Sequence, residues 1–161
     1  CALALAGLLS TRSAPVLDAG CGTGLSGLAL KKAGFENIVG CDFSLEMLEK
    51  AKEKNVYKRL FEADLNEKIE APNGAYAGIA CVGVFSFGHV SPDALTEILR
   101  VTEPGGFIVI GVNEHFFNED RFGETIHSLS NRGEIRELKR ELGAHLPAKD
   151  VKGWVLTLQK T

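Results

Sequence analysis

The chain has 161 residues, a net charge of −3 and 45% hydrophobic residues. This length suits one domain with its own core, and the hydrophobic fraction excludes a disordered chain. No block of Lys and Arg stands out, and no apolar run is long enough to cross a bilayer, so we expect neither a nucleic-acid nor a membrane partner. The composition favours one globular domain over residues 1–161.

The cysteines predict the redox environment of the chain. Cys1, Cys21, Cys41 and Cys81 form no C-x-x-C pair, which disfavours zinc, and we expect no metal site. Cysteines in strand-like runs usually behave as small buried apolar groups. We therefore expect free thiols in a reducing, cytoplasmic protein.

Hydrophobic periodicity and turn residues predict alternating helices and strands in the first half of the chain. The apolar start lacks the basic leader of a signal peptide, and it fits a helix better. The predicted elements are a helix over 2–10, a strand over 15–18, a helix over 25–33, a strand over 37–41, a helix over 45–54 and a strand over 57–62. Ser44 is predicted to cap the third helix, which has Leu45, Leu48 and Ala51 on its apolar side.

The second half continues the alternation. It is predicted to hold a strand over 77–84, a helix over 92–100 capped by Ser91, a turn over 104–106, a strand over 107–112, a helix over 123–130 and a strand over 154–159. The segment 135–142 leaves two interpretations open, because its apolar residues have helical spacing while the architecture favours a strand. Such alternation predicts an α/β fold, with a doubly wound, mostly parallel sheet and helices on both faces.

A glycine-rich loop follows the first predicted strand. Asp18 ends the apolar run, and Gly20, Gly22 and Gly24 then alternate with small residues. Glycine lets the backbone adopt positive φ and lets a ligand approach the main chain, while the helix that follows directs free N–H groups at the loop. An acid before the loop suits a ligand with hydroxyls or a positive charge better than a bare pyrophosphate.

Two nucleotide-type interpretations fit this loop. Residues 22–27 match the dinucleotide pattern G-x-G-x-x-G, with Asp42 about 20 residues beyond the loop, which favours a nicotinamide-dependent oxidoreductase. Read from Asp18, the stretch is Asp-x-Gly-x-Gly-x-Gly and resembles motif I of the Rossmann-like S-adenosylmethionine-dependent methyltransferases. A cofactor-binding module without catalysis is a third possibility, because a fold alone does not specify function.

Three acids are expected at the carboxyl ends of successive strands, where open α/β sheets bind ligands. Asp18 can attract an ammonium group, directly or through water, Asp42 can accept both ribose hydroxyls, and Asp64 can accept from an adenine amine. Phe43 and Met47 can pack on the adenine, and Leu65 can offer its backbone N–H. The alternatives are a helix-entry acid at Asp42, a turn residue at Asp64 and plain core at Phe43 and Met47.

Later segments extend the resemblance over about residues 15–113. Residues 100–106, Arg-Val-Thr-Glu-Pro-Gly-Gly, resemble the Leu-Arg-x-x-x-Pro-Gly-Gly turn of the methyltransferases, and residues 81–95 resemble the Williams-Beuren-region methyltransferase-like proteins. The resemblance implies a Rossmann-like sheet of about seven strands with an antiparallel last strand, and S-adenosylmethionine as cofactor with S-adenosylhomocysteine as product. It implies cofactor contacts at Asp18, Gly20, Cys21, Gly22, Gly24, Asp42, Phe43, Met47, Asp64, Leu65 and Val82.

The sequence departs from the family pattern in two places. One concerns the segment that covers the cofactor as a lid, and the other concerns the choice of methyl acceptor. Only residues 1–14 precede the first strand, and the chain begins without Met, so we expect a domain truncated at its N-terminus that lacks part of its lid. The fourth strand ends in residues 83–86, Gly-Val-Phe-Ser, instead of the Asn/Asp-Pro-Pro-Tyr signature of enzymes that methylate nucleobase or glutamine nitrogen. We therefore expect a small-molecule acceptor, with a protein side chain as the alternative.

Methyl transfer needs a base only if the attacking atom must lose a proton. His89 follows the fourth predicted strand and is our candidate for that base, although a structural loop histidine fits equally well. His115 is a second candidate, and Asn113 and Glu114 beside it could touch substrate.

Overall fold

The computed structural model describes residues 1–86, 90–119, 121–146 and 151–161, which form one seven-stranded sheet with helices on both faces. The strands are β1 (Val16–Ala19), β2 (Ile38–Asp42), β3 (Arg59–Glu62), β4 (Tyr76–Val82), β5 (Thr102–Asn113), β6 (Ile135–Leu146) and β7 (Val151–Lys160). The helices are α1 (Ala2–Leu8), α2 (Leu25–Lys32), α3 (Leu45–Lys52), α4 (Ala94–Val101), α5 (Glu114–Glu119) and α6 (Phe122–Asn131).

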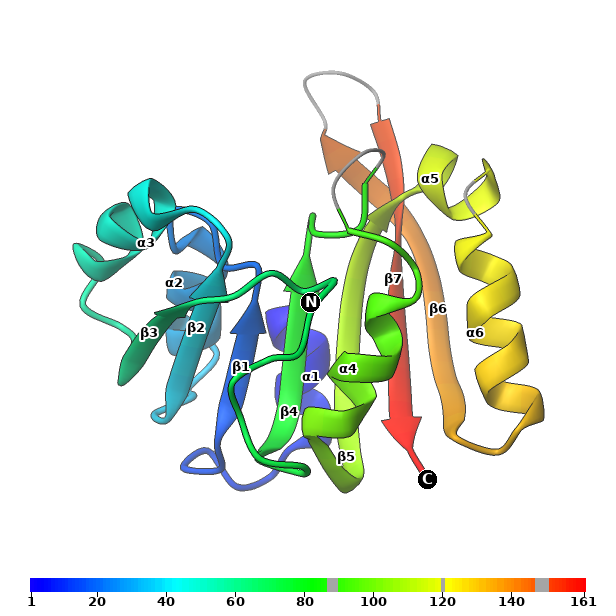
Figure 1. Cartoon of the computed structure of the whole chain (residues 1–161), viewed down its shortest axis with the longest axis horizontal. Coiled ribbons are helices and arrows are strands. Elements are labelled where there is room, and N and C mark those ends of the chain that lie inside the picture. Colours follow the sequence, from blue (N-terminus) through cyan, green and yellow to red (C-terminus); the bar gives the residue numbers. More distant parts are fainter. Residues whose placement is uncertain (87–89, 120, 147–150) are drawn as a thin grey trace.

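The strand order is β3-β2-β1-β4-β5-β7-β6 (Figure 1). Strands β1 to β5 pair in parallel, and β7 is antiparallel to both β5 and β6. The predicted doubly wound sheet with an antiparallel last strand is confirmed. Because the strand order reverses between β1 and β4, a crevice is expected at their carboxyl ends, at the top of Figure 1.

Two apolar clusters hold helices against the opposite faces of the sheet. In Figure 1, α4 lies in front of the sheet and α1 and α2 lie behind it. The front cluster joins Ile98 of α4 to Ile108 and Ile110 of β5. The back cluster joins Leu5 of α1 to Val109 of the same strand. Strand β5 is therefore apolar on both faces, as its sequence predicted for a central strand.

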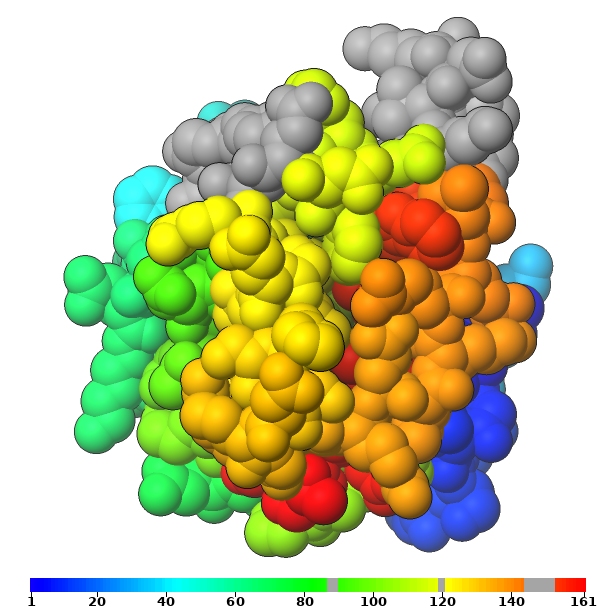
Figure 2. All heavy atoms as spheres, turned by 90° about the vertical axis from the view of Figure 1, so that its right-hand side faces the viewer, coloured from blue at the N-terminus to red at the C-terminus, as the bar shows by residue number. Residues whose placement is uncertain are grey.

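Strand β6 resolves the ambiguity over 135–142 in favour of a strand. It pairs with β7 and lies at the edge of the sheet beside α6 (Figure 2). Ile135 is buried, whereas Leu138 and Leu142 are exposed, so the helical spacing of these residues did not mark a buried helix face. Charged residues dominate the strand, including an Arg140–Glu137 pair at 2.7 Å. Charges of this kind protect an edge strand from pairing with another chain.

Three local predictions were wrong, and one helix was missed. The predicted turn 104–106 lies inside β5, where Thr102 pairs with Tyr76 and Phe107 with Gly78, so the extra residues form a bulge. Helix α4 begins at Ala94, after a turn containing Ser91 and Pro92, and α5 was not predicted at all. Leu45 is 62% exposed and does not belong to the buried side of α3.

No helix in the described part of the chain is long and apolar enough to cross a membrane. All four cysteines are free, and three of them, Cys21, Cys41 and Cys81, are buried as small apolar groups.

Candidate functional site

The glycine loop leaves β1 at the carboxyl edge of the sheet, as predicted. Gly20 and Gly22 have φ of +71° and +52°, a region that favours glycine. The N–H groups of Gly20 and Cys21 both donate to the carbonyl of Cys41, each at 2.9 Å, which ties the loop to β2. A Cβ at Gly20 would collide with Val84, whereas nothing described lies within 4 Å of a Cβ at Gly22. The loop is therefore packed at Gly20 and open at Gly22.

A cleft of about 860 Å³ opens beside this loop. Residues at the carboxyl ends of four strands, β1 to β4, line it, and Leu25 and Ser26 of α2, Met47 of α3 and Val90 complete the wall. Nine of the predicted cofactor residues are among its lining residues: Gly20, Cys21, Gly22, Asp42, Phe43, Met47, Asp64, Leu65 and Val82. The fold thus brings these nine residues together around one cleft.

Asp42 uses both carboxylate oxygens locally. Its Oδ2 accepts from the Gly22 N–H at 2.8 Å, and its Oδ1 accepts from the Ser44 N–H at 3.0 Å. Ser44 in turn caps α3 by accepting from the Met47 N–H at 3.3 Å. Each carboxylate oxygen can accept a further hydrogen bond. Asp42 therefore both shapes the loop and faces the cleft.

Two apolar side chains on the cleft wall are exposed. Phe43 is 70% exposed and Met47 is 36% exposed, so the alternative that they are core residues is excluded. An apolar ring and a thioether beside a polar loop suit a flat, partly apolar ligand. On the neighbouring loop, Asp64 Oδ1 accepts from the backbone and side-chain nitrogens of Asn66 at 2.9 and 3.0 Å, so Asp64 also holds a turn.

Asp18 lies one layer beneath the cleft wall and does not line it. Its carboxylate is 0% exposed, and its Oδ2 accepts from the Tyr57 hydroxyl at 2.7 Å and from the Ser26 hydroxyl at 2.8 Å. Its Oδ1 has no hydrogen-bond partner among the residues that the structure describes. Burial raises the pKa of Asp18 to about 6, against the lowering effect of the two hydroxyls, and the nearby Asp42 carboxylate raises it further. Tyr57 was not predicted as a site residue, because it precedes β3 and carries no motif.

The remaining predicted residues do not line the cleft or lie outside the described part of the chain. Gly24 does not line the cleft, because it packs against α3, where a Cβ would lie 3.1 Å from the Cα of Ala51. His89 lies outside the described residues. Asn113 accepts from the Phe116 N–H at 2.7 Å and so caps α5, and His115 is exposed on that helix.

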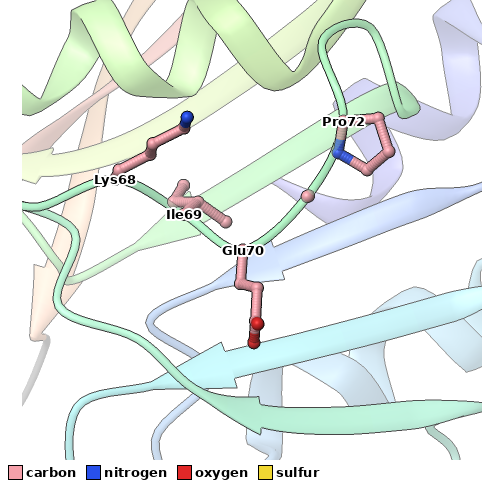
Figure 3. A pocket seen from close by; sticks show the side chains of 5 residues that line it. Lys68, Ile69, Glu70 and Pro72 are labelled. Carbon is pink, nitrogen blue, oxygen red and sulfur yellow. The ribbon is translucent and has the colours of Figure 1, made fainter.

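A second hollow, of about 600 Å³, lies beside residues 68–72 of the β3–β4 connection (Figure 3). One short segment supplies all of its lining, and the side chains of Lys68 and Glu70 point in different directions in Figure 3. It lacks the convergent polar groups that fix a bound ligand. The cleft beside the glycine loop is the better candidate site.

Helix α4 secures the β3–β4 connection that supplies Asp64 and Leu65 to the cleft. Arg100 donates to the carbonyl oxygens of Ile69 at 2.8 Å and Ala71 at 2.9 Å, and Glu97 accepts from the Ile69 N–H at 2.6 Å. The arginine of the methyltransferase-like segment 100–106 thus has a structural role in this chain.

Replacing Arg100 with methionine is expected to lower the free energy of unfolding by about 1–3 kcal/mol, because carbonyls on the connection lose a charged donor. Urea denaturation measures the change. Arg132→Met is the matched control, since Arg132 contacts the exposed side chains of Glu134 and Ser128 and its loss should change stability by less than about 1 kcal/mol. Equal effects of the two variants would contradict the proposed anchoring role.

Comparison with known proteins gives the family. A family model described as "Methyltransferase domain" matches residues 16–106. The chain is 39% identical over 99 residues to methyltransferase-like protein 27 of Homo sapiens, covering 61% of this chain and 40% of that protein. It is 38% identical over 95 residues to a demethylmenaquinone methyltransferase of Corynebacterium kroppenstedtii, covering 59% of this chain and 40% of that protein. The chain thus spans about two fifths of the length of these relatives.

A further relative bears on the expected partners. The chain is 30% identical over 102 residues to a tRNA (carboxymethyluridine(34)-5-O)-methyltransferase of Arabidopsis thaliana, a match that covers 60% of this chain and 23% of that enzyme. The relatives therefore include an enzyme named for a nucleic-acid substrate, and the expected exclusion of nucleic acid is not supported.

Solved structures agree on the fold. A TehB-like S-adenosylmethionine-dependent methyltransferase from Corynebacterium glutamicum superposes with a TM-score of 0.74 at 23% identity, covering 99% of this chain and 87% of that one. The family match, the strand order and the glycine loop confirm the resemblance drawn from the sequence, and the chain belongs to the methyltransferase domain family.

Proposed function

We propose that the chain binds S-adenosylmethionine in the cleft beside the glycine loop and transfers its methyl group to an acceptor. The observation that carries this proposal is the convergence of Asp42, Asp64, Phe43 and Met47 around one cleft of about 860 Å³, with Asp18 directly beneath it. This volume falls within the usual range for small-molecule sites, about 300–1,000 Å³. The open space at Gly22 also leaves room for a ligand close to the backbone.

In this proposal different residues contact different parts of S-adenosylmethionine. Asp42 would accept from the ribose hydroxyls, and Asp64 and the Leu65 N–H would bind the polar edge of the adenine, whose flat face packs on Phe43 and Met47. The unpartnered Oδ1 of Asp18 would attract the ammonium group of the amino-acid tail. Val82, exposed at the end of β4, would contact the methionine part.

The chemistry asks little of the protein beyond alignment. S-adenosylmethionine supplies a methyl group on a sulfonium; the acceptor atom forms a bond to the methyl carbon as the carbon–sulfur bond breaks, which leaves S-adenosylhomocysteine. Holding the acceptor in line and excluding water account for most of the rate in such a reaction. His89 remains the predicted base for an acceptor that must lose a proton.

We infer a small molecule as the acceptor class. The name demethylmenaquinone methyltransferase supports this for one relative, and the absence of a Lys/Arg block in the sequence agrees with it. A cytoplasmic location stays a prediction, supported by the free thiols.

Thermal unfolding with two candidate ligands tests the cofactor. S-adenosylhomocysteine at about 100 times its Kd should stabilise the chain by about 2.7 kcal/mol and raise Tm by about 5–10 °C, because it binds the folded state alone. NAD at the same concentration should leave Tm unchanged. A rise with NAD and none with S-adenosylhomocysteine would instead support the oxidoreductase interpretation.

A further inference from the structure

Tyr57 is placed beneath the candidate site by two glycines from different elements. A Cβ on Gly27 of α2 would overlap the Tyr57 hydroxyl, and a Cβ on Gly40 of β2 would lie 2.8 Å from its ring. The half-buried ring therefore occupies a slot that exists only because both residues lack side chains. Gly27 is the last glycine of the dinucleotide-like pattern, and in this chain its role is to admit a tyrosine.

From this slot the Tyr57 hydroxyl reaches the acid that ends β1. It donates to Oδ2 of Asp18 at 2.7 Å, and Ser26, which lines the cleft, donates to the same oxygen at 2.8 Å. Both donors converge on one carboxylate oxygen, and the buried Oδ1 is left without a partner. A buried polar atom without a partner is rare in folded proteins, and this one belongs to a carboxylate that Ser26 of the cleft wall contacts directly.

Several other titratable groups face Asp18 from the elements packed against it. Asp42 on β2 raises the pKa of Asp18, and Tyr57 and Ser26 lower it. The thiols of Cys21, Cys41 and Cys81 also surround it, and burial raises their pKa values well above the neutral range. Burial likewise raises the pKa of Tyr57, so its hydroxyl remains a donor at neutral pH. The pKa of about 6 places the change in charge of Asp18 between about pH 5 and pH 7.

We propose that Tyr57 is a positioning residue for cofactor binding: its hydroxyl, together with Ser26, holds Oδ2 of Asp18 and keeps the carboxylate ionised, so that its negative charge beneath the cleft wall attracts the ligand's ammonium group. This inference rests on the proposed function, since the ammonium group belongs to the amino-acid tail of S-adenosylmethionine. It predicts that cofactor affinity falls as pH drops through the titration of Asp18, and that Tyr57 sets where that fall occurs.

The test compares Tyr57→Phe with the wild-type chain. The phenylalanine ring still fills the slot, but the pKa of Asp18 should rise from about 6 to about 7, the scale of one hydrogen bond to a charged group. If only ionised Asp18 attracts the ammonium group, affinity for S-adenosylhomocysteine then falls about twofold at pH 7 and about fivefold at pH 6, and is nearly unchanged at pH 8.5. Titration calorimetry at the three pH values measures this.

Two controls separate this role from a general loss of packing. 5′-Methylthioadenosine lacks the amino-acid tail, so its affinity should be the same for both proteins at each pH. Tyr76→Phe makes the same chemical change in the front core cluster, and it should leave the pH profile unaltered. A loss that is equal for the two ligands, or independent of pH, would overturn the positioning role while leaving the proposed function intact.

A ligand-free measurement keeps the inference testable on its own. The carboxyl carbon of Asp18, followed by NMR, should titrate about one pH unit higher in Tyr57→Phe, and an unchanged midpoint would overturn the proposal. If Tyr57→Phe does not fold, Ser26→Ala removes the second donor to Oδ2 and should move the midpoint in the same direction. Absence of any S-adenosylhomocysteine binding by the wild-type chain would instead overturn the proposed function, and the inference with it.

Discussion

Replacing Asp42 with alanine is expected to weaken the binding of S-adenosylhomocysteine by more than about tenfold, the scale of losing one charged hydrogen bond. Two effects combine at this position. The variant loses the proposed acceptor of the ribose hydroxyls, and it also releases the N–H groups of Gly22 and Ser44, which are held at 2.8 and 3.0 Å. Titration calorimetry measures the affinity.

The structural and binding roles of Asp42 can be separated. Asp42→Asn keeps one oxygen acceptor and removes the charge, so it should retain more of the loop geometry than Asp42→Ala and lose less affinity. Asp93→Ala, a change at an exposed acid before α4, serves as the surface control. Unchanged affinity in Asp42→Ala would show that this carboxylate serves the loop and not the ligand.

Replacing Asp18 with asparagine should raise the stability of the ligand-free chain and reduce its affinity for S-adenosylhomocysteine by more than about tenfold. The pKa of Asp18 is about 6 in the folded state, above its ordinary value of 3.8. Between these values the folded state binds more protons than the unfolded state, so stability falls as pH rises through this window and stays lowered above it. An uncharged asparagine avoids that loss, and its oxygen can still accept from Tyr57 and Ser26.

The expected gain for Asp18→Asn is about 1–3 kcal/mol at about pH 7.5 and close to zero at about pH 3.5, where the wild-type carboxyl is mostly protonated in both states. Urea denaturation at the two pH values checks the sign, and Asp93→Asn is the exposed control. A stability loss at neutral pH would mean that the ionised carboxylate stabilises the fold. Loss of affinity together with a gain in stability is the pattern expected of a binding residue kept at the expense of stability.

Much of the fold could be predicted because its signals are local. The alternation of elements, the glycine loop and the apolar run at 107–112 each lie within a few consecutive residues. Where the local signal was weak, the prediction was wrong or incomplete: the Pro-Gly-Gly segment became a bulge in β5, and α5 was missed. Both depend on how a strand pairs with its neighbours or on how a short segment packs, which periodicity does not report.

In the candidate site, too, the features with local sequence signals could be predicted and those that depend on packing could not. Parallel strands carry their carboxyl ends to one edge of the sheet, so Asp18, Asp42 and Asp64 could be grouped from the sequence. How deeply each acid is buried could not be predicted from the sequence. Asp42 and Asp64 line the cleft, whereas Asp18 is fully buried beneath it. Burial depends on which side chains from other elements cover a residue, and no pattern around Asp18 indicates Tyr57.

The sequence by itself determined the fold class, the family and the strand ends at which a cofactor would bind, because these follow from short-range patterns of glycines, acids and apolar residues. Only the tertiary structure decided which residues support that site. Tyr57 meets Asp18 across 39 positions, and Arg100 meets Ile69 across 31, because separate elements pack together and two glycines make room. Such contacts arise from the packing of layers, and the physical state of Asp18 depends on them.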